Sequence, residues 1–347
     1  MKNHKASSGG VHGISGILAI CHCLAAVALA ASGGEVSPEG RLLVMNKGDR
    51  TVSVIEFPAG RTRATIPIEG VTGHELAASP DGKLAFVPIF GNAGVGSPGT
   101  DGEVMRVVHL EKGETVGTVA FGKGVRPHCV VFEPVRRLCY VTAELENAVM
   151  VVDPVAMKVV GRVPTGAVES HMLVISRDGK RGYTANVGPG TVSVLDFENR
   201  KLLKVVSVAR KVQRISSSVD DKWVFTADQD KPRLAMLETA SNEVKGWIEL
   251  PGIGYGTATT PDGKHLLVAL IRQNKVGVVD LETRAVIKEL DVPRAPQEIV
   301  IRPDGLRAYA SCDAAGEVAE IDLKGWSVVR LLKAGQGADG LAWANGL

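Results

Sequence analysis

Short apolar runs separated by turn residues recur along the chain, and residues 260–305 show one complete unit of this pattern. The same Pro-Asp-Gly turn stands at 261–263 and at 303–305, a step of 42 residues. Between the turns lie four runs of strand length, rich in β-branched residues and bounded by turn-forming or charged residues: Leu266–Leu270, Val276–Asp280, Ala285–Leu290 and Glu298–Ile301. The pattern predicts four β-strands per unit. One such unit needs copies on both sides to bury its faces.

Related corners recur through the whole chain. Their third positions fall at 39, 81, 135, 178, 220, 262 and 304, with steps of 42, 54, 43, 42, 42 and 42. Seven units of four strands each, at a period of about 40–45 residues, are typical of a β-propeller. We therefore expect an all-β fold, a seven-bladed β-propeller of four-stranded antiparallel blades, as a single domain over residues 35–347.

The second and third runs of the units resemble those of the YVTN-repeat β-propellers. Second runs read Tyr140-Val141-Thr142-Ala143 and Tyr183-Thr184-Ala185-Asn186, and a third run reads Thr191-Val192-Ser193-Val194-Leu195-Asp196. The resemblance covers residues 37–347 and implies a fold more than a function. It also implies that the strand before each Pro-Asp-Gly turn is innermost. The last run, Leu341–Ala344, then completes the first blade beside Arg41–Asn46 and closes the ring.

Residues 1–31 lie outside the repeats. Lys2 and Lys5 precede an apolar run, Ile14–Ala31, that ends in Ala28-Leu29-Ala30. This order is typical of a secretory signal peptide, here cleaved near Ala30. An uncleaved anchor is the alternative, because the run is close to the lower length limit of a membrane span. We expect a periplasmic or secreted protein with no membrane span after cleavage.

The net charge argues against one class of partner, and the number of cysteines argues against a fold held by disulfides. Without Lys2 and Lys5 the chain keeps 38 basic residues (40 − 2) against 38 acidic ones, which argues against nucleic acid as a partner. Three cysteines remain after cleavage, an odd number that excludes a disulfide framework and leaves their pairing state open: Cys129, Cys139 and Cys312. We expect a monomer, because propellers are often monomeric.

The repeat period brings seven polar or aromatic residues to one place, the start of each inner strand: His74, His128, His171, Gln213, Tyr255, Gln297 and Asp339. We expect them to ring one mouth of the channel, and we include Arg126 and Arg272 among the ligand-binding residues. The 54-residue step holds a Gly-rich insert between Pro88 and Glu103. We assign this insert to the blade whose inner strand begins at His128, and its composition predicts a mobile flap over the mouth.

Two functions are compatible with this mouth. The first is binding of a small molecule, a metal or a protein partner, with His74, His128 and His171 as candidate ligands of a divalent metal. A purely structural role for each histidine stays open. The alternative is a metal-dependent lactonase or lyase, which the resemblance to such propellers implies by position only. In that case His128 and His171 would act as base or metal ligands, with Glu144 or Glu169 as the acidic partner.

Overall fold

The computed structural model describes residues 39–133 and 135–345, which belong to one compact unit, Ser37–Leu347. The predicted signal peptide lies outside the described residues. Among the described residues, no helix is long and apolar enough to cross a membrane. The regular structure there is almost entirely β, with two 3-10 turns, Glu144–Glu146 and Asp313–Ala315.

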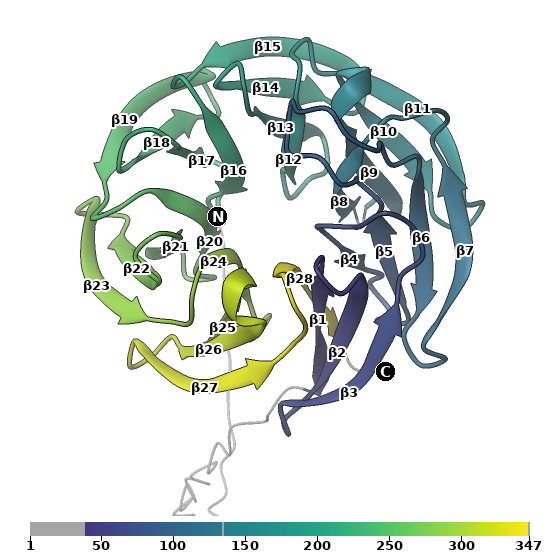
Figure 1. The fold of residues 1–347 in the computed structure, drawn as a ribbon. Coiled ribbons are helices and arrows are strands. Elements are labelled where there is room, and N and C mark those ends of the chain that lie inside the picture. Colours follow the sequence, from purple (N-terminus) through teal and green to yellow (C-terminus); the bar gives the residue numbers. More distant parts are fainter. Residues whose placement is uncertain (1–38, 134, 346–347) are drawn as a thin grey trace, which may run out of the picture. The chain divides into compact units, whose positions relative to one another are not determined.

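Four-stranded antiparallel sheets form seven blades around a central channel, as the sequence predicts (Figure 1). The strands, blade by blade, are β28 (Ala338–Asn345), β1 (Gly40–Asn46), β2 (Thr51–Phe57) and β3 (Arg61–Pro67); β4 (Ala77–Ala78), β5 (Leu84–Pro88), β6 (Val104–His109) and β7 (Glu114–Ala120); β8 (Pro127–Glu133), β9 (Leu138–Ala143), β10 (Ala148–Asp153) and β11 (Lys158–Pro164); β12 (Ser170–Ile175), β13 (Arg181–Asn186), β14 (Thr191–Asp196) and β15 (Lys201–Ser207); β16 (Val212–Ser217), β17 (Trp223–Asp228), β18 (Arg233–Glu238) and β19 (Glu243–Glu249); β20 (Gly254–Thr259), β21 (His265–Leu270), β22 (Lys275–Asp280) and β23 (Ala285–Asp291); and β24 (Pro296–Ile301), β25 (Arg307–Cys312), β26 (Glu317–Asp322) and β27 (Ser327–Lys333).

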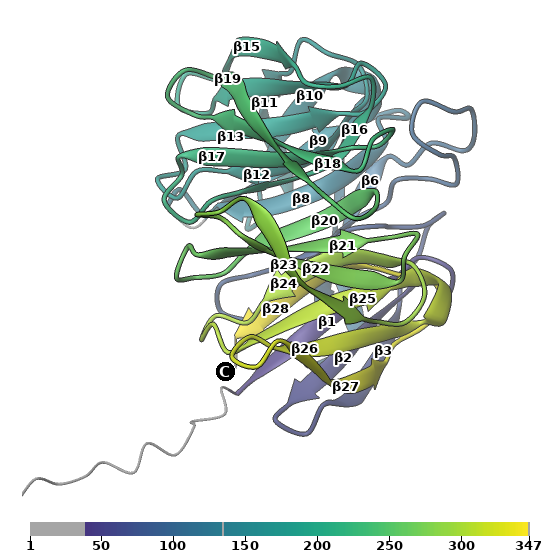
Figure 2. The same cartoon turned by 90° about the vertical axis from the view of Figure 1, so that its left-hand side faces the viewer.

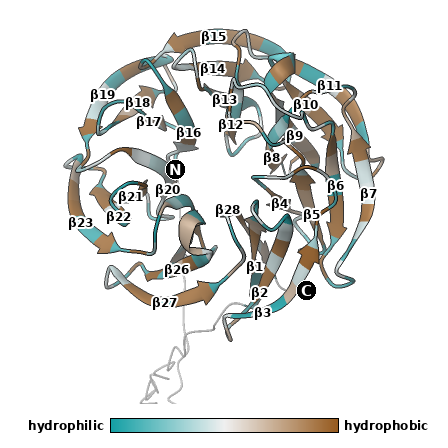
Figure 3. Cartoon of the chain, viewed as in Figure 1, coloured by the Kyte–Doolittle hydropathy of each residue, from teal (hydrophilic) through white to brown (hydrophobic). Residues whose placement is uncertain are grey.

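Burial explains why the middle strands are almost uniformly apolar and the outer strands alternate. β21 and β22 are covered on both faces by neighbouring blades, and nearly all of their residues are buried. The outer strand β23 is mostly exposed, and only Val286 and Leu290 turn toward the ring, because one of its faces packs and the other does not. Figure 3 shows this mixture of polar and apolar residues along the outer strands.

The C-terminal strand closes the ring, which confirms the predicted closure. β28 pairs antiparallel with β1 from Gly40–Asn345 to Asn46–Ala338, so the two ends of the described chain share one blade. Figure 2 shows the same strands from the side, with the blades β16–β19 and β20–β23 toward the viewer.

The recurring Pro-Asp-Gly corner is a hydrogen-bonded turn with a fixed geometry. In the corner at 260–265, the Thr260 hydroxyl donates to Asp262, and the same carboxylate accepts the backbone N–H of Lys264 at 3.0 Å. Gly263 has φ +71°, a left-handed conformation that costs glycine little. This geometry fixes where β20 ends and β21 begins.

Candidate functional site at the channel mouth

Six of the seven predicted mouth residues line a single cavity of about 190 Å³: His74, His128, His171, Gln213, Tyr255 and Asp339. All but His74 are the second residue of their inner strands. The seventh, Gln297, is not among the lining residues. It is buried and donates to the carboxylate of Asp313 at 3.1 Å. The ligand-binding roles themselves stay predictions.

The three histidines form one aromatic group under Phe90. The ring centroids of His128 and His171 lie 3.5 Å apart with a tilt of 32°, and His74 meets His128 edge-on at 5.3 Å. Phe90 lies 5.0–5.9 Å from all three rings. His128 and His171 are almost fully buried, and the Nδ1 atom of each has no hydrogen-bond partner among the described residues.

Burial keeps these imidazoles neutral. Desolvation, the largest cause, lowers the pKa of His74 to about 4, although the nearby Asp339 carboxylate opposes the shift. Desolvation also places the pKa of His128 and of His171 well below the usual value, with help from the neighbouring histidines and the Arg214 cation. At neutral pH each ring can therefore accept one hydrogen bond and donate one.

The three-histidine metal site stays a prediction without direct support. In the part of the chain that the structure describes, no three His, Cys, Asp or Glu side chains are grouped to hold a metal ion. His128 and His171 stack on each other. Stacked rings turn their faces toward each other, whereas metal binding needs their nitrogen atoms to point at a common centre.

A buried ion cluster lies directly against the histidines. Arg214 is almost fully buried, and its Nη atoms lie 2.7 Å from Glu75 and 2.8 Å from Asp339 and also contact Glu298. Lys47 adds a second cation at 3.0 Å from Asp339. Both cations of this cluster therefore have a carboxylate partner before any ligand arrives.

The three carboxyl groups of this cluster have pKa values that shift in different directions. Desolvation raises the pKa of Glu75 well above its usual value and that of Glu298 less strongly, although Arg214 opposes both shifts. Burial acts in the same direction on Asp339, but Arg214 and Lys47 outweigh it and lower its pKa. Asp339 is thus the carboxyl group whose charged form the cluster favours, while burial shifts Glu75 and Glu298 toward their protonated forms.

Sequence reasoning missed Glu75, Arg214 and Glu298, although each directly follows a predicted mouth residue. Neighbouring residues of a regular strand point to opposite faces, so only one of each pair was expected at the channel. The pairing register of β16 with β17 shifts between Val212 and Ile215, and β24 with β25 shows the same irregularity. Such a bulge turns two successive side chains toward the same space. The signal in the sequence was a charged residue directly after three of the predicted mouth residues.

The insert lies over the mouth, and Ala93, Gly94 and Val95 line the cavity with the histidines. It connects β5 and β6 and so belongs to the blade β4–β7, not to the blade that begins at His128 as the sequence suggested. The insert therefore follows the second strand of the blade that begins near His74. The mobility of the insert stays a prediction.

Arg126 and Glu144 hold the insert in place. Arg126 donates to the Asp101 carboxylate at 2.5 Å and to the Ser97 carbonyl at 2.7 Å, and it forms an ion pair with Glu144 at 3.2 Å. Glu144 also accepts the backbone N–H of Gly96 at 3.1 Å. Neither side chain lines the cavity.

The other two polar candidates also lie outside the cavity lining. Glu169 accepts the backbone N–H of Gly188 at 2.7 Å, and Arg272 is exposed. The predicted catalytic combination of two histidines with Glu144 or Glu169 is therefore not assembled around this cavity.

The fold and its repeats define a seven-bladed β-propeller of the YVTN-like type. A family profile described as "Cytochrome D1 heme domain" matches residues 98–303, and the chain belongs to this family. Relatives include the seven-bladed beta-propeller protein Rv1057 of Mycobacterium tuberculosis (strain ATCC 25618 / H37Rv), 29% identical over 129 residues, which are 36% of this chain and 33% of that protein. The uncharacterized protein YncE of Salmonella typhi is 23% identical over 171 residues, 48% of each chain. The chain thus matches between a third and half of the length of these relatives.

Solved structures with the same fold include the hydrazine synthase of Kuenenia stuttgartiensis, with a TM-score of 0.67 and 18% identity over 79% of this chain and 89% of that one. A functionally unknown protein from Desulfotomaculum acetoxidans DSM 771 has a TM-score of 0.73 and 12% identity over 88% of this chain and 99% of that one. At this level of identity the likeness concerns the fold alone.

Proposed function

We propose that the channel mouth binds a small polar ligand beneath the insert of residues 89–102. One observation carries the proposal. The Nδ1 atoms of His128 and His171, which both line the cavity, are buried and have no hydrogen-bond partner among the described residues. Buried polar atoms are nearly always paired, so a cluster of unpaired ones marks a place where a ligand or ordered water supplies the missing partner.

The size and chemistry of the cavity restrict the ligand. Its volume of about 190 Å³ is below the roughly 300–1,000 Å³ typical of sites for drug-sized molecules. The lining offers neutral imidazoles, the Tyr255 hydroxyl and the Lys47 ammonium group. A compact molecule with several hydrogen-bonding groups suits this lining.

The family description names haem, and we tested whether this mouth fits it. Imidazoles of the kind that ligate haem iron are present in His128 and His171. The enclosed space is too small for a tetrapyrrole, because Phe90 and residues 93–95 of the insert fill the region above the rings. We therefore base no part of the proposed function on haem.

The geometry favours binding over turnover. A lactonase or lyase would need an acid or a metal beside the imidazoles, whereas Glu144 holds the insert and Glu169 accepts a backbone N–H. A location outside the cytoplasm is part of the same proposal and rests on the signal-like residues 1–31. A metal ion or a protein partner at the mouth remains a competing ligand for the experiment to distinguish.

The proposal is tested by calorimetric titration and thermal melts of the full chain after metal chelation. The probes are small carboxylates, phosphate, Zn²⁺ and Cu²⁺. A probe that binds the mouth at about 100 times its Kd should stabilise the fold by about 2.7 kcal/mol. The effect should disappear in the His128→Gln/His171→Gln variant and persist in His109→Gln, since His109 lies in β6, away from the cavity.

Each outcome has a definite meaning. Binding of an organic or inorganic anion that requires both histidines supports the proposal. Retention of about one metal ion per chain, lost in the double variant, would make the site a metal centre. Equal binding by the double variant, or no binding of any probe, would contradict the proposal.

A further inference from the structure

A second cavity lies between the blades β16–β19 and β20–β23, away from the channel mouth. Its volume is about 540 Å³. It is lined by residues 218–223 and 262–265, where the turns after the inner strands lead into the second strands, and by residues 280–282 at the end of β22. These turns lie at the end of the blades opposite the starts of the inner strands, so this cavity opens on the other face of the ring.

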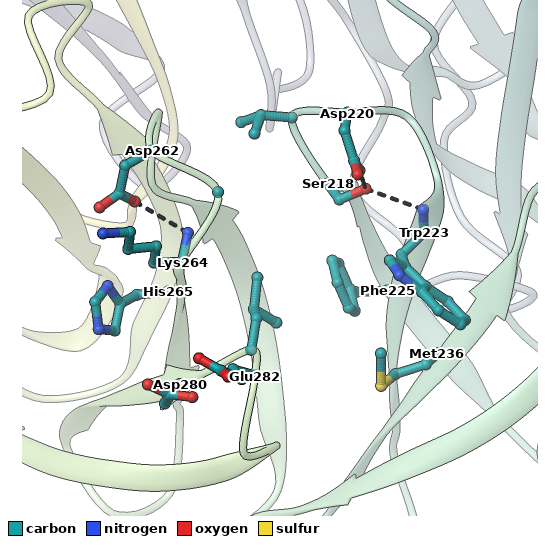
Figure 4. A pocket seen from close by; sticks show the side chains of 13 residues that line it. Ser218, Asp220, Trp223, Phe225, Met236, Asp262, Lys264, His265, Asp280 and Glu282 are labelled. Atoms are coloured by element: carbon teal, nitrogen blue, oxygen red, sulfur yellow. Dashed lines mark hydrogen bonds between the residues drawn. The ribbon is translucent and has the colours of Figure 1, made fainter.

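The two walls of the cavity differ in chemistry (Figure 4). The blade β16–β19 contributes the rings of Trp223 and Phe225, and the blade β20–β23 contributes the carboxylates of Asp280 and Glu282 across the cavity. Lys264 is the one Lys or Arg among the lining residues. Trp223 is only partly buried, so its side chain remains accessible from the cavity.

Trp223 differs from the other three tryptophans, which all have a partner. The Arg233 guanidinium lies 3.7 Å from the Trp247 ring centroid, His265 packs edge-on to Trp326 at 5.0 Å, and Trp343 stacks on Tyr309 at 5.8 Å. Within the described residues, Trp223 has neither an aromatic nor a cationic neighbour of this kind. An accessible indole face beside carboxylates is the arrangement that attracts organic cations.

In one other blade, the position equivalent to His265 holds an arginine that pairs with the acid opposite it. The first residue of the second strand faces the last residue of the third strand in the pairs Arg307–Asp322 and His265–Asp280. In the blade β24–β27, Arg307 forms an ion pair with Asp322. In the blade β20–β23 the arginine is replaced by His265. Among the described residues, neither Asp280 nor Glu282 has a Lys or Arg partner within 4.0 Å.

We propose that this cavity binds a small organic cation, whose ammonium or guanidinium group lies against Trp223 and faces Asp280 and Glu282. The ligand supplies the charge that arginine supplies in the blade β24–β27. The volume of the cavity is within the range of small-molecule sites. This proposal is independent of the proposed function at the channel mouth, because the two cavities share no lining residue.

Isothermal titration of the full chain with choline tests the proposal, and the neutral carbon isostere of choline is the control ligand. Choline should bind, and the isostere should bind at least about tenfold more weakly, because it lacks the charge. The first variant, Trp223→Leu, removes the aromatic ring that would contact the cation and keeps an apolar side chain in its place. Asp280→Asn/Glu282→Gln removes two charges, while the amide introduced at position 280 can still accept the backbone N–H of Thr283, as the carboxylate does. Each variant should weaken choline binding by about tenfold.

The matched control comes from the repeat. Asp196 and Glu198 occupy the positions 84 residues before Asp280 and Glu282, two blades away, so Asp196→Asn/Glu198→Gln removes the same charges without touching the cavity. This control should bind choline as the unaltered chain does, and thermal melts should show all three variants folded. Equal binding of choline and its isostere, or equal weakening by the control variant, would overturn the proposal. Binding of a lysine-rich peptide without any binding of choline would overturn it as well.

Discussion

The histidines at the channel mouth are kept uncharged by their surroundings, and this makes them a source of pH-dependent stability. His128 and His171 pack against each other, and His74 lies near both Lys47 and Arg214. Protonating any of the rings would place a further charge in a site that already contains two cations. Neutral rings suit a ligand site, because they can change hydrogen-bonding partners without a change of charge.

We predict that His74→Asn makes the fold less sensitive to acid. The folded pKa of His74 is about 4, whereas an unfolded histidine titrates near 6.5, so between these values the unfolded chain binds more protons. Stability is therefore lost as the pH falls through this window. Between pH 7 and pH 5 the unaltered chain should lose about 2 kcal/mol more than the variant, as measured by urea unfolding. Identical losses in the two proteins would refute the assigned shift.

The mouth residues were predictable from the repeat, but the ion cluster beside them was not. A strict period places the same repeat position of every blade at the same end of the channel, and six of the seven predicted residues do line the cavity. The contribution of Glu75, Arg214 and Glu298 depends on local irregularities of strand pairing, which sequence alternation does not reveal. Cavity volume and ring stacking depend on three-dimensional packing and could not be read from the chain.

The boundaries of the strands agree closely with the predicted runs. The position of the insert was also predictable, but the contacts that hold it were not. β21 to β24 begin and end within two residues of the predicted runs, because apolar runs bounded by turn residues leave little choice of boundary. The insert contains few apolar side chains. It is held instead by charged contacts to Arg126 and Glu144, residues that the sequence suggested for ligand binding and catalysis.

We predict that Arg126→Met loosens the insert without unfolding the blades. The substitution removes the contacts to Asp101 and Ser97 and leaves Glu144 without its cation. Backbone amides of residues 92–100 should exchange with deuterium about tenfold faster or more, while those of β8 and β9 remain protected. Arg272→Met is the matched control, because Arg272 is exposed and does not line the mouth cavity. Unchanged exchange in Arg126→Met would show that Arg126 does not hold the insert.

The ring as a whole depends on one strand from the end of the chain. β28 supplies the inner strand of the first blade, packs against the inner strands on either side and carries Asp339 into the mouth. Its Trp343 packs against Phe57 and Tyr309, which belong to the first and last blades. The contacts of β28 therefore connect the first and last blades to the binding site, and the cavity is complete only when the ring is closed.

We predict that removing residues 341–347 abolishes cooperative unfolding, whereas removing residues 346–347 alone does not. The longer deletion takes Leu341 to Asn345 from β28, exposes the edge of β1 and uncovers Phe57 and Tyr309. Trp343 is only partly buried, but the deletion also removes Leu341 and Ala344, which are buried, and the paired backbone of β28. Together these losses are a large part of the roughly 5–15 kcal/mol by which an ordinary domain is stable. Calorimetry should show a broad transition, or none, for the longer deletion and a single sharp transition for the shorter one. A sharp transition in both would mean that six blades and three strands are sufficient, and that β28 serves the binding site more than the fold.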